Sequence, residues 1–443
     1  MSTFSPERHW AEAFAAAADV RAGEPPWLEA TRKGALARFA ELGVPARKHE
    51  EWKYTRAERI ANHPWQPAAA ASIGAEALDE LELPVAAAPR LVFVNGRLAP
   101  DLSRLDGLPP GVVATNAGAL LPRDGAWLEP RLDVPVPFTD RAFAALAVAM
   151  APDAAVVRIP RDVSVEATLW VLFVSAPGED VAASPRLIVE AEPGAGLRLV
   201  ELHASLGASR QLHNALTEIV AGAAASVEHL RLQLEGAGTT HVAHVHARVA
   251  RDARYASRTI ALGAELSRLD LVVTLAEEGA EATLDGLYVA AQTQHHESRT
   301  CVDHQRPHGT SRELYKGVLA GRARGVFSGK VLVRKDAQKS SAEQKNENLL
   351  LSRDAEVDSK PQLEIEADDV RCTHGSTIGQ LDEDALFYLR ARGLDAPAAR
   401  ALLVRGFLGE ILAGVEDEAL RESLEARALA TLSRAGVAAG GAP

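Results

Sequence analysis

The sequence predicts a mainly β protein in which a coiled, parallel β-solenoid is flanked by helical segments at both ends. Short β-branched or alternating runs, such as "LWVLFVS" and "RLIVEAE", lie between Gly, Pro and acidic residues over residues 90–375. An Ala-x-(small or apolar) motif recurs there at intervals of 30, 28, 27, 43 and 32 residues, at Ala195, Ala225, Ala253, Ala280, Ala323 and Ala355. A solenoid explains both features, because each coil buries its faces only against its neighbours and has small residues at its corners.

Two other architectures compete with the solenoid. Amphipathic helices do not interrupt the strand runs, which argues against a βαβ fold. A β-sandwich stays open, but the near-even spacing of the alanines favours the solenoid. With 443 residues, 47% of them apolar, the chain is long enough for a large core and for two or three structural units.

Residues 1–89 are expected to form an N-terminal helical domain and a linker. Ser5-Pro6 and Pro26-Trp27 are helix starts, because proline suits the first helical position. Four of the six tryptophans fall in this segment, so it is expected to pack on an apolar surface. Residues 66–89 are rich in alanine and have few large side chains, which is typical of a linker or a loosely packed edge.

Residues 90–380 are the strand-rich region with the β-helix core, and residues 381–443 form a C-terminal helical domain. Asp382 is a helix N-cap, and Gly393 lies just beyond the end of the helix that it begins. Asp395 begins a second helix, and a third follows it. The last eight residues, "GVAAGGAP", are expected to be a disordered tail.

Composition and charge exclude several classes of protein. The formal net charge is −12 and no block of Lys and Arg occurs, which argues against a nucleic-acid partner. The long uncharged runs are too short or too broken by Pro and Gly to span a membrane. No signal peptide is visible and two cysteines make no disulfide framework, so a cytoplasmic protein is expected.

The first candidate site lies in "ADDVRCTHGST". Leu363 and Ile365 alternate with polar residues, and the continued strand pattern places Cys372 and His374 on one face. An imidazole and a thiolate are suitable ligands for iron or zinc, so Cys372 and His374 are candidate metal ligands. Two ligands do not complete a site, so others would come from elsewhere or from a second chain. A purely structural last strand is the competing interpretation.

A second candidate cluster occupies residues 295–308. Its potential ligands are His295, His296, Cys301, Asp303, His304 and His308. Their spacing matches no zinc pattern, and on strands half of these side chains would face away from the rest. A polar edge of the β region is the simpler interpretation.

No catalytic motif is visible. The segment "GVFSGKV", residues 325–331, has one residue too few between its glycines for a phosphate-binding loop and continues as a strand. We therefore expect no ATP site in this chain. No nucleophile elbow and no pair of carboxylates stands out, so the protein is expected to be non-catalytic.

The segment from about Lys316 to Leu412 resembles the SufD subunits of the SufB/SufD family, which belong to the Suf iron–sulfur cluster assembly scaffold. The resemblance is carried by "ENLLLS", "VDSKPQLEI" and "ADDVRCTHG", and the N-terminal "RKHEEWKYT" fits the same family. The resemblance implies a right-handed parallel β-helix flanked by helical domains. It also implies a scaffold role without turnover of its own.

The resemblance further implies two partners. A SufB-like paralogue pairs through the β-helix, and a SufC-like ATPase docks on the C-terminal helical domain. The histidine that matches His374 lies at the SufB–SufD interface in this family and is implicated in cluster formation with a cysteine of SufB. His374 is thus expected to be a ligand of a transient iron–sulfur cluster shared with the SufB-like partner, with Cys372 as the second candidate. A homodimer of the isolated chain stays open.

Two alternatives from other classes remain. One is a β-helix carbohydrate-active enzyme, which would be secreted and would carry clustered carboxylates in a groove. The other is a stand-alone zinc-binding protein built on the cluster at residues 295–308, which would hold stoichiometric zinc.

Overall fold

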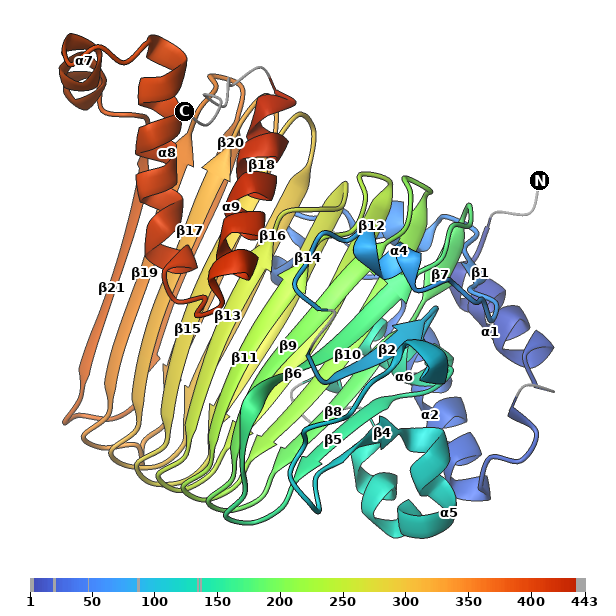
Figure 1. Cartoon of the computed structure of the whole chain (residues 1–443). Coiled ribbons are helices and arrows are strands. Elements are labelled where there is room, and N and C mark those ends of the chain that lie inside the picture. Colours follow the sequence, from blue (N-terminus) through green and yellow to red (C-terminus); the bar gives the residue numbers. More distant parts are fainter. Residues whose placement is uncertain are drawn as a thin grey trace.

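The computed structural model describes residues 4–18, 21–46, 48–85, 88–133, 135 and 138–435 of the chain. Within these ranges the backbone forms a parallel β-solenoid of about eight turns with helices at both ends (Figure 1). The expected fold class, a mainly β parallel β-helix flanked by helical segments, is confirmed. The predicted tail, residues 436–443, lies outside the described residues.

Two long sheets form the walls of the solenoid. In the described residues, one sheet of 11 strands runs in the order β20-β18-β16-β14-β12-β10-β8-β5-β4, with β1 and β7 beside this path. The other, of 10 strands, runs β21-β19-β17-β15-β13-β11-β9-β6-β2-β3. The strands are β1 Gln66–Pro67, β2 Arg90–Val94, β3 Arg97–Leu98, β4 Val113–Asn116, β5 Ala155–Ile159, β6 Ser164–Ser175, β7 Val181–Ala183, β8 Arg186–Ala191, β9 Gly196–Ser205, β10 Gln211–Ala221, β11 Ser226–Gln233, β12 Thr239–Val249, β13 Arg254–Ala261, β14 Leu266–Leu275, β15 Glu281–Ala290, β16 His295–His304, β17 Thr310–Leu319, β18 Arg324–Val333, β19 Ser341–Leu350, β20 Glu356–Ile365 and β21 Arg371–Gly379.

From β8 onward, successive strands alternate between the two sheets. Each strand pairs in parallel with the strand two positions along the chain, so one coil of the solenoid consists of two strands. Residues in register therefore stack in columns along the solenoid: His213 on β10 pairs with His241 on β12, for example. Because side chains alternate between the faces of a strand, every second column points into the space between the sheets.

The recurring alanines mark solenoid corners. Four directly precede strands of the ten-stranded sheet and two precede strands of the eleven-stranded sheet, which explains the longer interval of 43 residues. In the first four corners the preceding residue has a left-handed φ, between 55° and 74°, at Gly194, Ala224, Asp252 and Gly279. The six alanines are at most 5% exposed, so the corner leaves no room for a larger side chain.

The N-terminal helices cover the outer face of the eleven-stranded sheet. They are α1 Pro6–Ala16, α2 Pro26–Leu42, η2 Glu50–Trp52 and α3 Ala57–Ala61. The short helix α4 Glu76–Asp79 lies instead on the ten-stranded sheet, where Ala77 and Leu78 share a buried cluster with Trp170 of β6. The helix starts predicted at Pro6 and Pro26 are confirmed. Trp10 and Trp52 pack in one buried cluster with Leu212 of β10 and Val242 of β12, so the tryptophans anchor this layer on the sheet.

Two helices interrupt the early strands, contrary to the prediction. Between β4 and β5 lie α5 Ala117–Leu128, the short η4 Glu129–Arg131 and α6 Ala142–Met150; η3 Pro100–Leu102 precedes them. The sequence of α6, "AFAALAVAM", is apolar on all sides, because the helix is buried between α2 and β10. A helix without a polar face leaves no amphipathic period to detect.

The C-terminal helices are α7 Glu383–Ala391, α8 Ala396–Leu412 and α9 Glu418–Ser433. The predicted caps are confirmed: Asp382 accepts from two backbone N–H groups of α7, and Asp395 from that of Ala398. Leu408 of α8 and Leu424 of α9 are fully buried in a cluster with residues of the ten-stranded sheet. The two longer helices, α8 and α9, thus cover the outer face of that sheet, whereas α7 packs against α8 and extends away from the sheet (Figure 1).

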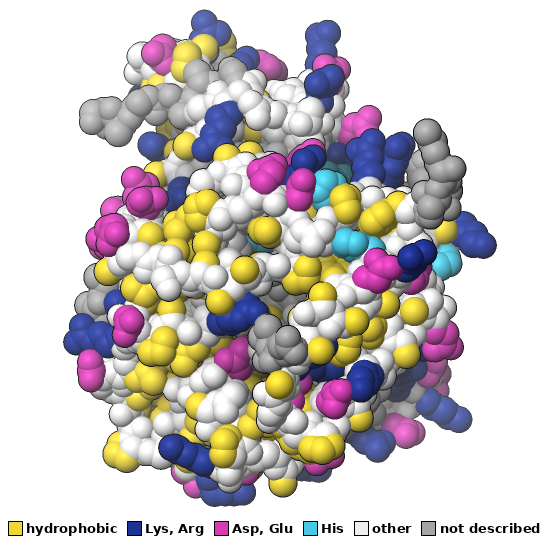
Figure 2. Space-filling model, turned by 90° about the vertical axis from the view of Figure 1, so that its right-hand side faces the viewer, with side chains coloured by type: hydrophobic (Ala, Val, Ile, Leu, Met, Phe, Trp, Pro, Cys, Tyr) yellow, Lys and Arg dark blue, Asp and Glu magenta, His cyan; other side chains and the backbone are white. Residues whose placement is uncertain are grey.

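Figure 2 shows the end of the molecule where the N-terminal helices lie. Basic and acidic side chains are interspersed with hydrophobic ones on this face, and neither sign forms a continuous block. Among the described residues, no helix is long and apolar enough to cross a membrane.

Candidate functional site

The candidate ligands lie on the terminal coil, which we define as β20 and β21. Each of these strands is the last of its sheet, and β21 pairs only with β19 among the described residues. No further coil formed by the described residues covers them, and all their residues are exposed or half-buried, whereas the preceding strands are largely buried. The terminal coil therefore presents open backbone edges at one end of the solenoid (Figure 1).

His374 is exposed on β21, in a column that points into the solenoid. Its register partner is Gln344 on β19, whose own register partner is Glu313 on β17. The Nε2 atom of Gln344 donates to Oε2 of Glu313 at 2.6 Å, and both of these side chains are buried. His374 is thus the open end of a polar column, with the imidazole accessible to a ligand or a second chain.

Glu313 is a buried carboxyl group two coils below His374. Burial raises its pKa from 4.5 to about 7, although the hydrogen bond from Gln344 acts in the opposite direction. Within the described part of the chain, the Oε1 atom of Glu313 and the Oε1 atom of Gln344 have no hydrogen-bond partner. The column below His374 therefore has spare acceptor capacity and a carboxyl group that changes charge near neutral pH.

Cys372 faces the same side as His374 but has a different environment. It is half-buried against a small apolar cluster that includes Val331, Ala342 and Ala367. Burial raises the pKa of the Cys372 thiol, which keeps the sulfur protonated and weakens it as a ligand. Of the two predicted ligands, His374 is thus the accessible one.

The histidines and the cysteine at residues 295–308 do not form one site. On β16, His296 and His304 belong to columns that point into the solenoid, whereas His295 and Cys301 point to the outer face. His296 bonds the backbone oxygen of Gly263 at 2.8 Å, and His295 bonds the hydroxyl of Thr55 at 2.7 Å. His308 has a left-handed φ of 61° at a solenoid corner, which gives it a structural role. The structure agrees with the simpler interpretation of residues 295–308, a polar edge of the β region.

The N-terminal segment 48–55 connects to the terminal coil. Glu50 forms an ion pair with Lys360 of β20, and Trp52 is buried beneath the guanidinium of Arg268, 3.9 Å from its carbon to the ring centre. An ion pair and a cation–π contact thus hold this segment against the outer face of the eleven-stranded sheet.

Exposed large hydrophobic side chains gather at this end of the chain. Ile365 ends β20 and Ile378 lies on β21, at 44% and 51% exposed. On α7 and α8 the exposed ones are Phe387, Tyr388 and Leu402. Apolar groups of this size on an open sheet edge and an adjacent helix are typical of interaction surfaces.

One group of polar residues was missed by the sequence analysis. His203, Glu235 and His241 lie together inside the solenoid, with a ligand atom of each within 4.8 Å of the others. The signal was the alternation of polar residues along otherwise apolar strands, as in "VELHA" and "HVAHVHA". This alternation does not match the spacing of any known metal-ligand motif. The three residues come together through the register between coils, and not through their distance in the sequence.

Comparison with known proteins identifies the family. Residues 173–407 match the model described as "SUF system FeS cluster assembly, SufBD core domain", and residues 5–171 match "SufBD protein N-terminal region". An iron–sulfur cluster assembly SufBD family protein of Synechocystis is 33% identical over 394 residues, 86% of each chain. The iron–sulfur cluster assembly protein SufD of Escherichia coli is 30% identical over 88% of this chain and 90% of its own. A SufBD family protein of Mycobacterium tuberculosis is 35% identical over 73% and 85%.

The two family matches divide the chain within the early coils, where the helix-interrupted strands give way to the regular solenoid. The core match includes the whole terminal coil with Cys372 and His374, and it ends within α8. The relatives match over most of their own length as well as most of this one. The chain therefore belongs to the SufBD family of iron–sulfur cluster assembly proteins.

Proposed function

We propose that this chain is a non-catalytic scaffold subunit, which builds and transfers iron–sulfur clusters together with a SufB-like and a SufC-like partner. The observation that carries the proposal is the exposed His374 on an uncovered terminal coil. This family membership leaves no support for the alternative of a carbohydrate-active enzyme. In the proposal, residues 90–380 form the β-helix and residues 1–89 hold it. Residues 381–443 form the ATPase-docking domain.

The SufB-like partner is proposed to pair with the terminal coil. The strand edges of β20 and β21 leave backbone groups that a matching edge of a second solenoid can satisfy by strand addition. Ile365 and Ile378 would be removed from water in such a pairing. The same edges would support a homodimer when the partner is absent.

His374 is proposed to supply one ligand to the cluster, which is the cargo of the complex. Neutral imidazole binds iron through a ring nitrogen, and cysteine of the SufB-like partner would supply thiolate ligands. Cys372 is proposed as a second, weaker contributor, because its thiol must leave the apolar cluster and lose its proton to bind iron. One imidazole and one thiol do not hold a cluster alone, so the isolated chain is expected to be colourless.

The SufC-like ATPase is proposed to dock on the C-terminal helical domain. Phe387 and Tyr388 of α7, at 75% and 58% exposed, supply aromatic anchors of the kind enriched at protein interfaces. ATP hydrolysis belongs to that partner in this proposal, since the segment 325–331 is part of β18 and not of a phosphate-binding loop.

The test is anaerobic co-purification of the three-protein complex, followed by assays of iron and acid-labile sulfide. We expect His374→Ala to assemble a complex of normal stoichiometry that retains less than about a third of the wild-type iron and sulfide. The matched control is His308→Ala, which removes another described histidine from a solenoid corner far from the terminal coil in sequence. If the His374→Ala complex is intact and contains as much iron and sulfide as the wild type, the proposal is wrong and the terminal coil is a structural cap.

A further inference from the structure

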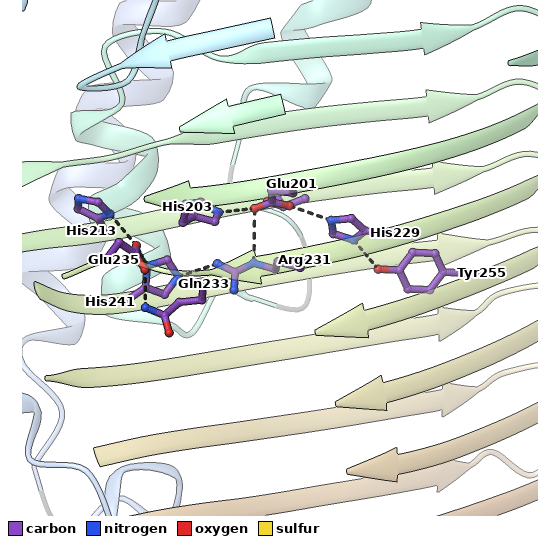
Figure 3. A network of polar contacts seen from close by, with 10 residues as sticks. Glu201, His203, His213, His229, Arg231, Gln233, Glu235, His241 and Tyr255 are labelled. Carbon is purple, nitrogen blue, oxygen red and sulfur yellow. Dashed lines mark hydrogen bonds and ion pairs between the residues drawn. The ribbon is translucent and has the colours of Figure 1, made fainter. Parts of the chain in front are cut away.

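The middle of the solenoid holds a polar network in the space that apolar side chains fill elsewhere (Figure 3). Its residues come from β9 to β13 and the corner after β11, and none is more than 2% exposed. The labelled members are Glu201, His203, His213, His229, Arg231, Gln233, Glu235, His241 and Tyr255. A polar cluster of this size inside a core is costly unless every group is satisfied or serves a ligand.

Three of these side chains approach closely enough to share one ion. A ring nitrogen of His203, a ring nitrogen of His241 and a carboxylate oxygen of Glu235 lie within 4.8 Å of one another. The rings of His203 and His241 are 4.9 Å apart, centre to centre, and nearly perpendicular. Two imidazoles and a carboxylate are a frequent ligand set of protein-bound zinc.

His203 is already oriented as a metal ligand. Its Nε2 atom donates to Oε1 of Glu201 at 2.6 Å, which leaves Nδ1 with the lone pair. That Nδ1 atom is buried and has no hydrogen-bond partner among the residues that the structure describes. A histidine that donates one ring N–H to a carboxylate and offers the other nitrogen is the arrangement that surrounds metal ions in proteins.

The charges of the network favour a cation. Glu201 and Glu235 each bond the rings of two histidines inside the solenoid. Arg231 is the one guanidinium among the labelled residues, so the two carboxylates exceed it by one negative charge. A buried excess of this kind attracts a cation and repels an anion.

We propose that His203, Glu235 and His241 bind one zinc-type divalent cation inside the solenoid. On binding, Nδ1 of His241 would release its hydrogen bond to Oε1 of Glu235, 2.6 Å away, and its proton would move to Nε2, which would give up its contact with Arg231. It would tie together β9, the corner after β11 and the start of β12, and so connect consecutive coils. The site is separate from the terminal coil, and the inference goes beyond the proposed function.

The neighbouring side chains can support such an ion. His213 bonds the same Oε1 atom of Glu235 at 2.7 Å and is anchored by Ser175 at its other nitrogen. Gln233 donates to the second oxygen of Glu235. Partners of this kind fix the orientation of a ligating carboxylate. Because the site is fully buried, the ion would enter while the chain folds and would exchange slowly afterwards.

The test measures zinc in the full chain, expressed without a metal-binding tag in zinc-supplemented medium and washed with EDTA. We expect about one zinc per wild-type chain and less than one-tenth in His203→Gln, whose amide still donates to Glu201. The control is His296→Gln, which removes another fully buried imidazole of the solenoid interior and should keep about one zinc per chain. Far-UV circular dichroism verifies the fold of each variant.

A second readout needs no variant. X-ray absorption at the zinc edge of the wild-type protein should show nitrogen and oxygen ligands at about 2.0–2.2 Å, including imidazole, with no sulfur at about 2.3 Å. Sulfur in the coordination shell would assign the ion to Cys301 or Cys372 and overturn the proposal. A wild-type chain without zinc, or equal zinc in His203→Gln, would overturn it too.

Discussion

Neighbouring residues on one strand can have very different chemistry, as Cys372 and His374 do on β21. Both face the same side, but an apolar cluster shelters the thiol while the imidazole stands at the open end of its column. Alternation along the strand was predictable from the sequence; the environments were not. They depend on Ala342 and Gln344, which register brings beneath these residues from the preceding coil.

The Glu313 carboxyl should make stability depend on pH. Its pKa is raised from 4.5 to about 7 by burial, so the folded chain holds a proton that the unfolded chain releases between these pH values. Stability should therefore fall as the pH rises from about 4.5 to 7 and then level off. Glu313→Gln, which stays neutral, should remove this fall and stabilise the protein by about 3 kcal/mol at pH 8. Thermal unfolding of both proteins at pH 5 and pH 8 measures the difference.

The matched control for this prediction is Glu343→Gln on the adjacent strand β19. The Glu343 carboxyl is exposed and pairs with Lys345 at 2.8 Å, so its loss should leave the fall between pH 5 and pH 8 in place. An unchanged fall in Glu313→Gln would show that another group causes it.

At the scale of elements, the corners were predictable and the interior was not. The alanine motif located six strand starts, because these buried corner positions leave no room for a larger side chain. It could not locate the glycines that face the interior tyrosines. Gly286 on β15 packs against Tyr315, its register partner on β17, and a methyl group there would lie 2.1 Å from the ring.

Gly286→Ala should therefore destabilise the solenoid. The ring of Tyr315 is fully buried and cannot move freely, so overpacking should cost roughly 1–3 kcal/mol and lower the midpoint of thermal unfolding. Gly375→Ala on β21 is the control: no atom of another described residue lies within 4 Å of the added carbon, so stability should change little. Equal effects of the two substitutions would contradict the close packing of the interior.

The edge of the terminal coil should determine partner binding. Ile378→Lys places a charge on the exposed face of β21, where the SufB-like partner is proposed to pair, and a buried unpaired charge is strongly unfavourable. We expect affinity for the partner to fall at least tenfold in calorimetry while the fold of the isolated chain stays intact. Leu105→Lys, at an exposed leucine near η3, should bind as the wild type does. If Ile378→Lys binds the partner as tightly as the wild type does, the interface does not lie on the terminal coil.

At the scale of the whole molecule, the sequence predicted the solenoid and its flanking helices but not how they combine. Strand runs, corner alanines and helix caps are local signals, and they correctly indicated the wall strands and α7 to α9. The helix α6 escaped because it is buried on all sides. The polar network around Glu235 escaped because it is assembled from three consecutive coils. Chemistry that depends on register between coils is not visible in spacing along the chain.

The central claim is that His374 of this chain is a ligand of the assembled cluster. The most direct measurement is pulsed electron paramagnetic resonance of the reduced complex, with ¹⁵N-histidine incorporated only into this chain. We predict a directly coordinated nitrogen whose hyperfine coupling changes from that of ¹⁴N to that of ¹⁵N on labelling, and His308→Ala should retain it. A cluster without coordinated nitrogen, or with nitrogen coupling that labelling of this chain leaves unchanged, would contradict the account.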